Sequence, residues 1–259
     1  MEYVRAHFRV IRYRRPKLAC AWGDAIVQQP APSRPIERGI AGPNLLAHII
    51  TSKFLDYQPL YRQQAIYARD SMEPDAGQAD GPLAGGRVSW LLSPLVVAVR
   101  TYALGGTKVH CDDTPLPVLE AGRGSTKTGR LWVYVRHDRP SGSDEAPAVW
   151  FAYTPDRRGE HPQRHLASFS GVPQADAFAG YAPLYEDGSI RKAACMAHAR
   201  RKIYDLHAVR PNAITEEALH RIGELYRIEA EIRGKPSDER RQARQAKAVP
   251  RLDALRQWY

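Results

Sequence analysis

Cysteine is scarce in this sequence, and long apolar runs and an N-terminal targeting signal are missing. The three cysteines, Cys20, Cys111 and Cys195, are far apart and odd in number, which argues against a disulfide framework and fits a reducing cytoplasm. No apolar run approaches the roughly 20 residues that a membrane span needs. The arginine-rich start of the chain lacks the apolar block of a signal peptide. These absences predict a cytoplasmic protein without a membrane partner.

Acidic residues are also in deficit. The 28 Asp and Glu residues against 38 Lys and Arg leave a formal net charge of +10. So basic a chain favours a polyanionic partner, nucleic acid before a membrane surface. Hydrophobic residues make up 43% of the 259 residues and charged residues 25%, which indicates a globular protein of one large domain or two small ones.

A short strand-like run in the middle of the chain stops at a pair of acids. Residues 108–111 alternate polar and apolar side chains, and Asp112 and Asp113 follow. Because Asp and Pro are poor inside strands, we expect the strand to end at the acids, with an extension to Leu119 as the alternative. A second run, 171–176, ends on an acid in the same way.

Two strands that each deliver one carboxylate can build a divalent-metal site for phosphoryl transfer. An acid at the end of a central strand is costly to bury unless it binds a cation or a hydrogen-bond donor. The alternative is that Asp112 and Asp176 only cap the turns that follow their strands. On these two runs alone both interpretations stay open.

The composition changes along the chain and predicts four segments. These are a basic arm and Pro-rich linker (1–43), a helical region (44–106) with an irregular loop (70–87), an α/β unit (107–196) and a basic helical segment (197–259). Three arginines of the basic arm are candidate DNA-binding residues: Arg12, Arg14 and Arg15. Within the helical region, apolar spacing predicts helices over 44–54, 60–68 and 88–102.

The α/β unit has the element order of an RNase H-like fold. Its patterns predict strands at 108–112, 131–135, 149–153, 171–176 and 190–195, and helices at 160–169 and 178–185. The expected architecture is a mixed five-stranded sheet with helices, preceded by the small helical region and followed by a helical insertion or C-terminal helices. In such a sheet the first and fourth strands are neighbours, so Asp112 and Asp176 converge, which favours the metal site.

Three other patterns in the chain are incomplete. Cys20 lacks the second cysteine of a zinc knuckle, so we expect no zinc. His161 and His165 lie four apart without the Glu of a metalloprotease helix, so we interpret both as surface residues. The loop before Lys127 lacks the glycine that a phosphate-binding loop requires. We interpret it as a hairpin loop whose Lys127, with Arg130, contacts DNA phosphates.

Six short motifs resemble those of one protein family. They are His110–Pro115 (HCDDTP), Thr128–Arg136 (TGRLWVYVR), Gln174–Gly180 (QADAFAG), Cys195–Arg201 (CMAHARR), Pro59–Gln64 (PLYRQQ) and Ile228–Gly234 (IEAEIRG). Together they make the chain similar to the central domain of the insertion-sequence-66 family of transposases, from about residue 17 to the end.

This resemblance implies a DDE-type DNA transposase that acts on the double-stranded ends of an insertion sequence, as a homo-oligomer on DNA. Such enzymes hold two Mg²⁺ or Mn²⁺ ions between carboxylates. One ion activates water or a DNA 3′-hydroxyl, and the other stabilises the leaving oxygen.

Matched motif by motif, Asp112 corresponds to the first acid and Asp176 to the second, both as metal ligands. Asp113 is the weaker choice for the first acid, because the family has either Asp or Glu there. Three residues at the basic start of the helix after the last strand complete the expected DNA-binding set: His198, Arg200 and Arg201.

The third acid stays open. The chain lacks an Asp-Asn-Asn-x-x-Glu-Arg motif expected further on in the family, which predicts a truncated copy with two of three acids. The competing candidate is Glu229, whose alternative is an ordinary surface glutamate. Three functions therefore remain: a DNA transposase, whole or truncated; an inactive remnant that binds DNA non-specifically; and an RNase H-like nuclease acting on RNA–DNA hybrids.

Overall fold

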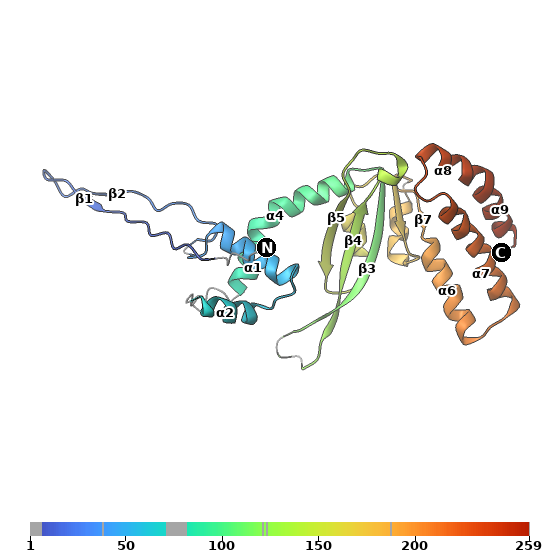
Figure 1. Ribbon diagram of the computed structural model, residues 1–259, viewed down its shortest axis with the longest axis horizontal. Coiled ribbons are helices and arrows are strands. Elements are labelled where there is room, and N and C mark those ends of the chain that lie inside the picture. Colours follow the sequence, from blue (N-terminus) through green and yellow to red (C-terminus); the bar gives the residue numbers. More distant parts are fainter. Residues whose placement is uncertain are drawn as a thin grey trace, which may run out of the picture. The chain divides into compact units, whose positions relative to one another are not determined.

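The chain is divided into two units in a computed structural model, Met1–Leu95 and Val96–Tyr259 (Figure 1). The structure describes residues 7–37, 39–70, 82–120, 122, 124–186 and 188–258. One helix, α4 (Pro82–Leu104), crosses the boundary between the two units.

The first unit contains a small β-hairpin and helices. Its elements are β1 (Lys17–Ala19), β2 (Ile26–Gln28), α1 (Pro43–Phe54), α2 (Leu60–Arg69) and the start of α4. The two strands pair antiparallel within the segment predicted as a basic arm. Helices α1 and α2 confirm the two helices predicted from the apolar spacing of the sequence. The buried side-chain amide of Gln63 in α2 donates a hydrogen bond to the backbone carbonyl of Ile49 in α1 at 3.1 Å.

The irregular loop predicted over 70–87 is wrong for residues 82–87, which belong to α4. Proline is tolerated in the first turn of a helix, where its missing N–H has no partner to lose, so Pro82 begins this helix. Gly85 and Gly86 lower helix propensity without preventing helix formation. The remainder of that prediction, 71–81, lies outside the described residues.

The second unit contains the predicted mixed five-stranded sheet. Its strands are β3 (Lys108–Val118), β4 (Lys127–Arg136), β5 (Ala148–Thr154), β6 (Val172–Ala175) and β7 (Ala193–Ala194). They lie in the order β5-β4-β3-β6-β7. Strand β3 is antiparallel to β4 and parallel to β6, and β6 is parallel to β7. The first and fourth strands of the α/β unit are therefore neighbours, as in the RNase H-like arrangement.

Strand β3 does not end at the acids, so the alternative with a longer strand is the correct one. Its pairing with β6 covers only Lys108 to His110, with His110 opposite Gln174. Beyond that point β4 is the one strand paired with β3 among the described residues. A proline on the free side of a strand breaks no ladder bond, which explains how Pro115 and Pro117 are accommodated.

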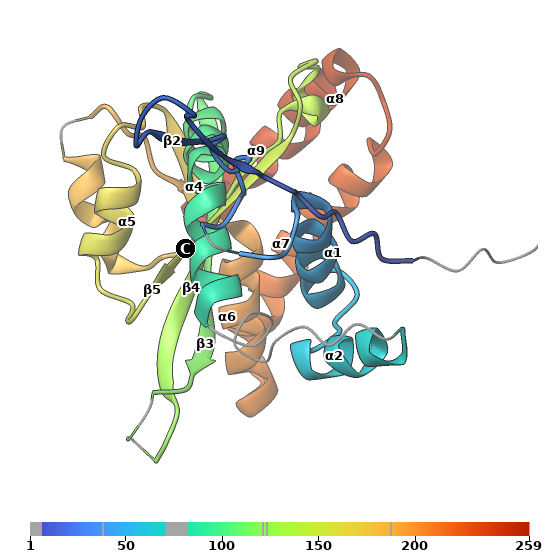
Figure 2. The ribbon, with the colours of Figure 1, turned by 90° about the vertical axis from the view of Figure 1, so that its left-hand side faces the viewer.

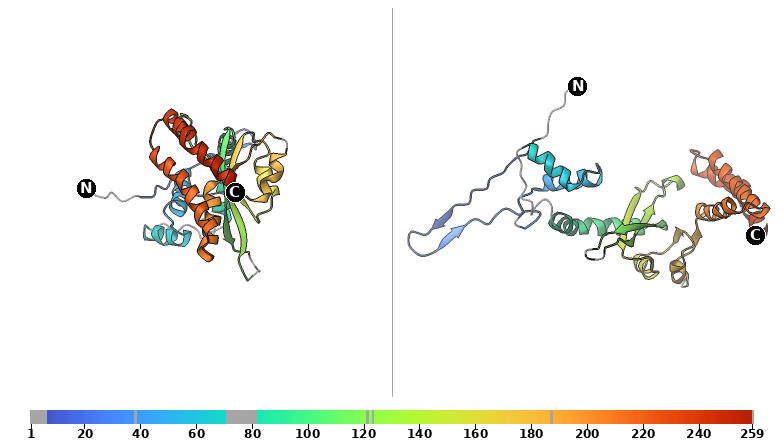
Figure 3. Two further views of the ribbon diagram at one scale, coloured as in Figure 1. Left: turned by 90° about the vertical axis from the view of Figure 1, so that its right-hand side faces the viewer. Right: turned by 90° about the horizontal axis from the view of Figure 1, so that it is seen from below.

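Two helical elements cover one face of the sheet, and the C-terminal helices lie on the other side (Figures 2 and 3). The covering elements are α5 (Glu160–His165) and the 3₁₀ helix η2 (Ala179–Tyr185). Between them and the sheet lies an aromatic core that includes Trp132, Tyr134, Trp150 and Tyr181. Helix α5 ends at His165, earlier than predicted, although Leu166 and Phe169 beyond it are still buried.

Gly171 fixes the start of β6 against β3. Its φ of 141° is strained for other residues, and a Cβ there would overlap the carbonyl oxygen of Thr107. The next residue, Val172, donates its N–H to that carbonyl at 2.9 Å. This close approach sets the register that brings Asp176 to the end of β6 beside β3. Strand β7 is shorter than predicted, with Ile190 contributing an isolated bridge to Gly171.

The remainder of the second unit is helical, as predicted. The helices are α6 (Met196–Val209), α7 (Ala213–Glu231), α8 (Ser237–Ala243), the π-helical turn η3 (Arg244–Ala248) and α9 (Val249–Trp258). A 3₁₀ turn, η1 (Arg139–Ser141), lies earlier in the unit, between β4 and β5. Asn212 caps α7 by accepting from the N–H of Thr215 at 2.9 Å. Within the described part of the chain, no helix has the length and apolarity to span a membrane.

Candidate active site

The two neighbouring acids of β3 have opposite environments. Successive side chains of a strand point to opposite faces, and Val109, Cys111 and Asp113 share the face covered by α5 and η2. The Asp113 side chain is only 2% exposed. Asp112 is exposed, and its Oδ1 accepts the Asp113 backbone N–H at 2.9 Å.

Two arginines compensate the buried carboxylate of Asp113. Arg157 donates from Nε to both oxygens at 3.0 Å and from Nη2 to Oδ1 at 2.8 Å. Arg130 donates from Nη1 to Oδ2 at 3.1 Å. The bonds to Asp113 raise the pKa of Arg157, and its guanidinium lies over the Phe178 ring, 4.3 Å from the centroid. Both oxygens of Asp113 are thus engaged by cations.

Asp176 follows β6 and shares Arg157 with Asp113. Its Oδ2 accepts from Arg157 Nη2 at 2.9 Å, and its Oδ1 accepts from the Phe178 N–H at 3.1 Å. Because one Nη2 atom reaches both carboxylates, Asp113 and Asp176 lie close together with the guanidinium between them. The β3–β6 pairing ends at His110 and Gln174, and the β3 acid that shares a partner with Asp176 is Asp113, not Asp112.

Asp112 lies in a pocket of about 180 Å³ on the other face of the sheet. Its lining residues are His110, Cys111, Asp112, Val133, Val135, Gln174, Cys195 and His198. The His110 ring therefore neighbours Asp112 on this face. The pKa of His110 is lowered, mainly because the ring is partly buried and also because the positive charge of Lys108 is near.

Glu229 is not brought to the two aspartates. Its carboxylate forms a two-point ion pair with Arg244, Nε to Oε1 and Nη2 to Oε2, both at 2.7 Å. Arg244 lowers the pKa of Glu229 through these bonds. Among the described residues, no group of three or more His, Cys, Asp or Glu side chains is placed to hold a metal ion.

The predicted DNA-binding residues fall into two groups. Arg12, Arg14 and Arg15 precede β1 and are exposed, and Arg200 and Arg201 are exposed on α6. The others have different surroundings. Lys127 pairs with Glu120 at 3.6 Å, Arg130 is committed to Asp113, and His198 lines the Asp112 pocket.

His161 and His165 are buried, so the prediction of surface histidines is wrong. The helical face on which they lie packs against the sheet. His161 Nε2 lies 2.7 Å from Asp156 Oδ1, and His165 Nδ1 lies 2.9 Å from the Tyr134 hydroxyl. The rings of Trp132, Tyr134 and Trp150 surround His165 edge-on. Both histidines therefore have structural partners.

We expect His165 to make the fold sensitive to mild acid. Burial, with Arg164, His161 and Arg100 adding to it, lowers the pKa of His165 to about 4. The unfolded chain, with an ordinary pKa near 6.5, takes up this proton first. The native state therefore keeps its full stability above about pH 6.5 and loses up to about 3 kcal/mol of it as pH falls to 4.

Urea unfolding of wild type and His165→Gln between pH 7.5 and 4 measures this contribution. The difference in unfolding free energy between the two proteins should shrink as pH falls. A difference that stays constant over this range would contradict the assignment.

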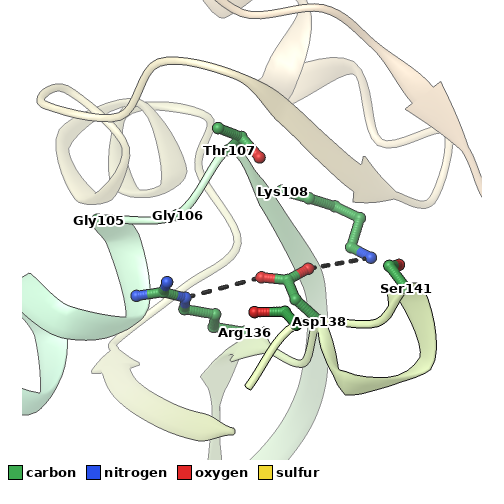
Figure 4. A pocket seen from close by; sticks show the side chains of 8 residues that line it. Gly105, Gly106, Thr107, Lys108, Arg136, Asp138 and Ser141 are labelled. Atoms are coloured by element: carbon green, nitrogen blue, oxygen red, sulfur yellow. Dashed lines mark ion pairs between the residues drawn. The ribbon is translucent and has the colours of Figure 1, made fainter. Parts of the chain in front are cut away.

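A larger pocket, of about 490 Å³, lies at the beginning of β3 (Figure 4). Its charged side chains are paired with one another, Lys108 with Asp138 at 3.1 Å and Arg136 with Asp138 at 3.7 Å. Neither Asp112 nor Asp176 lines it. The larger hollow is therefore not the site of the acids.

Comparison with known proteins decides the family. The model of the family described as "Transposase IS66 family" matches residues 38–259. The chain belongs to the IS66 family of transposases. The match covers the whole sheet and the C-terminal helices, so the resemblance carried by the sequence motifs is confirmed.

Curated relatives of this IS66-family chain come from Sinorhizobium fredii. "Uncharacterized protein y4hP" is 35% identical over 274 residues, covering 100% of this chain and 49% of the relative. "Uncharacterized protein y4qI" is 37% identical over 255 residues, covering 96% of this chain and 47% of the relative. "Uncharacterized protein y4jD" is 36% identical over 263 residues, covering 99% and 51%. The chain spans about half the length of these relatives.

Proposed function

We propose that this chain carries the two-aspartate part of the catalytic core of a DDE-type DNA transposase, which cleaves and transfers DNA strands at insertion-sequence ends. The observation that supports the proposal is that Asp112 lies on β3 and Asp176 directly follows β6, the parallel neighbour of β3 in an RNase H-like sheet. Membership of a transposase family supports the reaction class. Double-stranded DNA is the proposed substrate, bound by a homo-oligomer.

Asp112, rather than Asp113, is the proposed first acid. Both oxygens of Asp113 are engaged by Arg130 and Arg157, and its side chain is almost fully buried. A metal ion would have to displace these cations from a site that water hardly reaches. Asp112 is exposed, and the described contacts of its side chain amount to one backbone N–H. Its oxygens therefore stay open to a hard divalent cation.

Mg²⁺ or Mn²⁺ is the proposed cofactor, because carboxylate oxygens suit such ions. When bound, these ions activate the attacking oxygen and stabilise the leaving one. Asp112 and Asp176 offer carboxylates for one ion at most, since the described residues offer no group of three donors. Arg157 donates a hydrogen bond to Asp176 Oδ2, so it would have to share or release that carboxylate when an ion binds.

Direct measurement of Mn²⁺ binding tests the proposal without requiring turnover. We expect wild type to bind one ion, seen as loss of the free Mn²⁺ signal in electron paramagnetic resonance. Asp112→Asn and Asp176→Asn should each weaken binding about tenfold or more, because affinity depends on ligand charge. Glu229→Gln is the matched control and should bind like wild type. Wild-type affinity in Asp112→Asn would refute the site.

An inactive remnant that binds DNA by charge alone is the second candidate, favoured by the lack of a third donor near the two aspartates among the described residues. Mn²⁺-dependent nicking of duplex DNA separates the two. We expect little or no nicking by this chain. Robust nicking that is lost in both Asp112→Asn and Glu229→Gln would instead establish Glu229 as the third acid.

A further inference from the structure

His198 lines the same pocket as Asp112, although it belongs to α6, after the last strand of the sheet. Within the described part of the chain, neither ring nitrogen of His198 has a hydrogen-bond partner, and its Nδ1 atom is buried. An unpaired polar side chain beside a candidate catalytic acid needs an explanation. His161 has Asp156 and His165 has Tyr134 as a hydrogen-bond partner, and His198 has no comparable partner within the described residues.

We propose that His198 is a catalytic residue that donates a hydrogen bond from Nε2 to a phosphate oxygen of the DNA held at the Asp112 pocket. This inference rests on the proposed function and adds a residue to its site. The hydrogen bond from His198 would contact the reacting phosphate specifically, whereas the positive charge of the chain attracts every phosphate of the DNA equally.

The buried Nδ1 atom fixes which nitrogen carries the proton. A neutral imidazole has one N–H donor and one acceptor nitrogen. Leaving a buried N–H unpaired costs more than leaving a lone pair unpaired, because unsatisfied N–H groups are the rarer ones in proteins. The proton of neutral His198 therefore resides on Nε2. That atom is not among the buried unpaired atoms, so it stays accessible to a ligand.

The position of His198 in α6 favours an anion. It lies in the first turn of a 14-residue helix whose first turn has no acid and whose N-cap residue, Cys195, makes no side-chain cap. The free backbone N–H groups at such an end carry partial positive charge, which adds to the imidazole donor. Cys195 also lines the pocket, so this end of the helix adjoins Asp112.

A phosphodiester suits these groups better than a metal ion does. The pocket holds too few correctly placed donors for a metal site of its own, as judged over the described chain. Arg200 and Arg201 continue from His198 along α6 and are exposed, which suits a polyanion. Asp112 repels a phosphate but attracts a divalent cation, so the two sides of the pocket bind complementary parts of one metal–DNA substrate.

The tautomer can be measured on the wild-type protein. In long-range ¹H–¹⁵N spectra at pH 8, with the signal assigned by its absence in His198→Gln, we expect the Nε2–H form of His198. Addition of a short DNA duplex, in the presence of Mg²⁺ rather than Mn²⁺, should shift the Nε2 signal of His198. An Nδ1–H tautomer, or an unshifted signal at saturating DNA, would overturn the proposal.

DNA affinity of variants gives the second test, by fluorescence anisotropy with the same duplex. His198→Leu should bind roughly 3- to 10-fold more weakly, the worth of one hydrogen bond. His198→Gln, whose amide reaches the Nε2 position, should recover most of that loss. The salt dependence should be unchanged, because no charge is removed. The exposed His220 of α7 supplies the control, and His220→Leu should bind like wild type.

The two proposals fail in different ways. If His198→Leu binds DNA like wild type while Asp112→Asn still loses Mn²⁺, the role of His198 is wrong and the metal site stands. If Asp112→Asn keeps its Mn²⁺ affinity, the proposed function fails whatever the behaviour of His198. Equal losses in His198→Leu and His198→Gln would also overturn the hydrogen bond, since the glutamine retains a donor.

Discussion

The affinity of the chain for duplex DNA should fall about 500-fold when monovalent salt rises from 50 to 200 mM. Five exposed arginines form no ion pair within the described residues: Arg12, Arg14, Arg15, Arg200 and Arg201. If each neutralises one phosphate, counterion release gives a slope of log affinity against log salt of about −4.5. Fluorescence anisotropy across a salt series measures this slope directly.

Substitutions show which of these charges cause the salt dependence of DNA binding. Arg12→Gln, Arg14→Gln and Arg15→Gln together should make the slope shallower by about 3. The control removes the same charge from three residues that already have acidic partners: Arg221→Gln, Arg244→Gln and Lys247→Gln. Its slope should stay close to that of wild type. Equal slopes in both triple variants would show that net charge, and not these positions, determines DNA affinity.

The order of strands was predictable because the longer strands of the sheet carry their own local signals. Apolar runs such as 131–135 and 149–153 are long enough to identify a strand, and their order with the helices leaves few topologies. The short elements were not predictable in detail. Strand β7 has two residues, and η2 is a 3₁₀ helix, so neither has enough residues to show a period. Their ends depend on packing against the sheet.

The candidate site was predictable in part. Asp176 follows the end of β6 as predicted, whereas Asp112 lies inside β3, which continues to Val118. The burial of Asp113 follows from its parity with Val109 and Cys111, a signal present in the sequence. Arg157 gave no such signal. It lies 44 positions from Asp113 and 19 from Asp176, and a contact over such separations has no periodicity to reveal it. The unpaired ring of His198 likewise depends on where α6 begins relative to β3.

Arg157→Met should destabilise the protein by about 2–4 kcal/mol. The substitution leaves the Asp113 carboxylate, 2% exposed, with Arg130 as its remaining cationic partner. Removing one member of a buried ion pair is costly because the other charge stays desolvated. We place the effect below the full cost of a buried pair, because the Arg157 side chain is 36% exposed and Arg130 remains.

A double-mutant cycle separates this cost from loss of packing. Asp113→Leu combined with Arg157→Met removes the stranded charge together with its partner, so the double variant should be more stable than Arg157→Met alone. The neighbouring Arg158 is the control: its side chain is 74% exposed and pairs at 3.4 Å with Asp156, so Arg158→Met should change stability by less than about 0.5 kcal/mol. Urea unfolding of wild type, Asp113→Leu, Arg157→Met, the double variant and Arg158→Met gives the values. If the double variant is no more stable than Arg157→Met, the stacking of Arg157 on Phe178, and not the burial of Asp113, accounts for the loss.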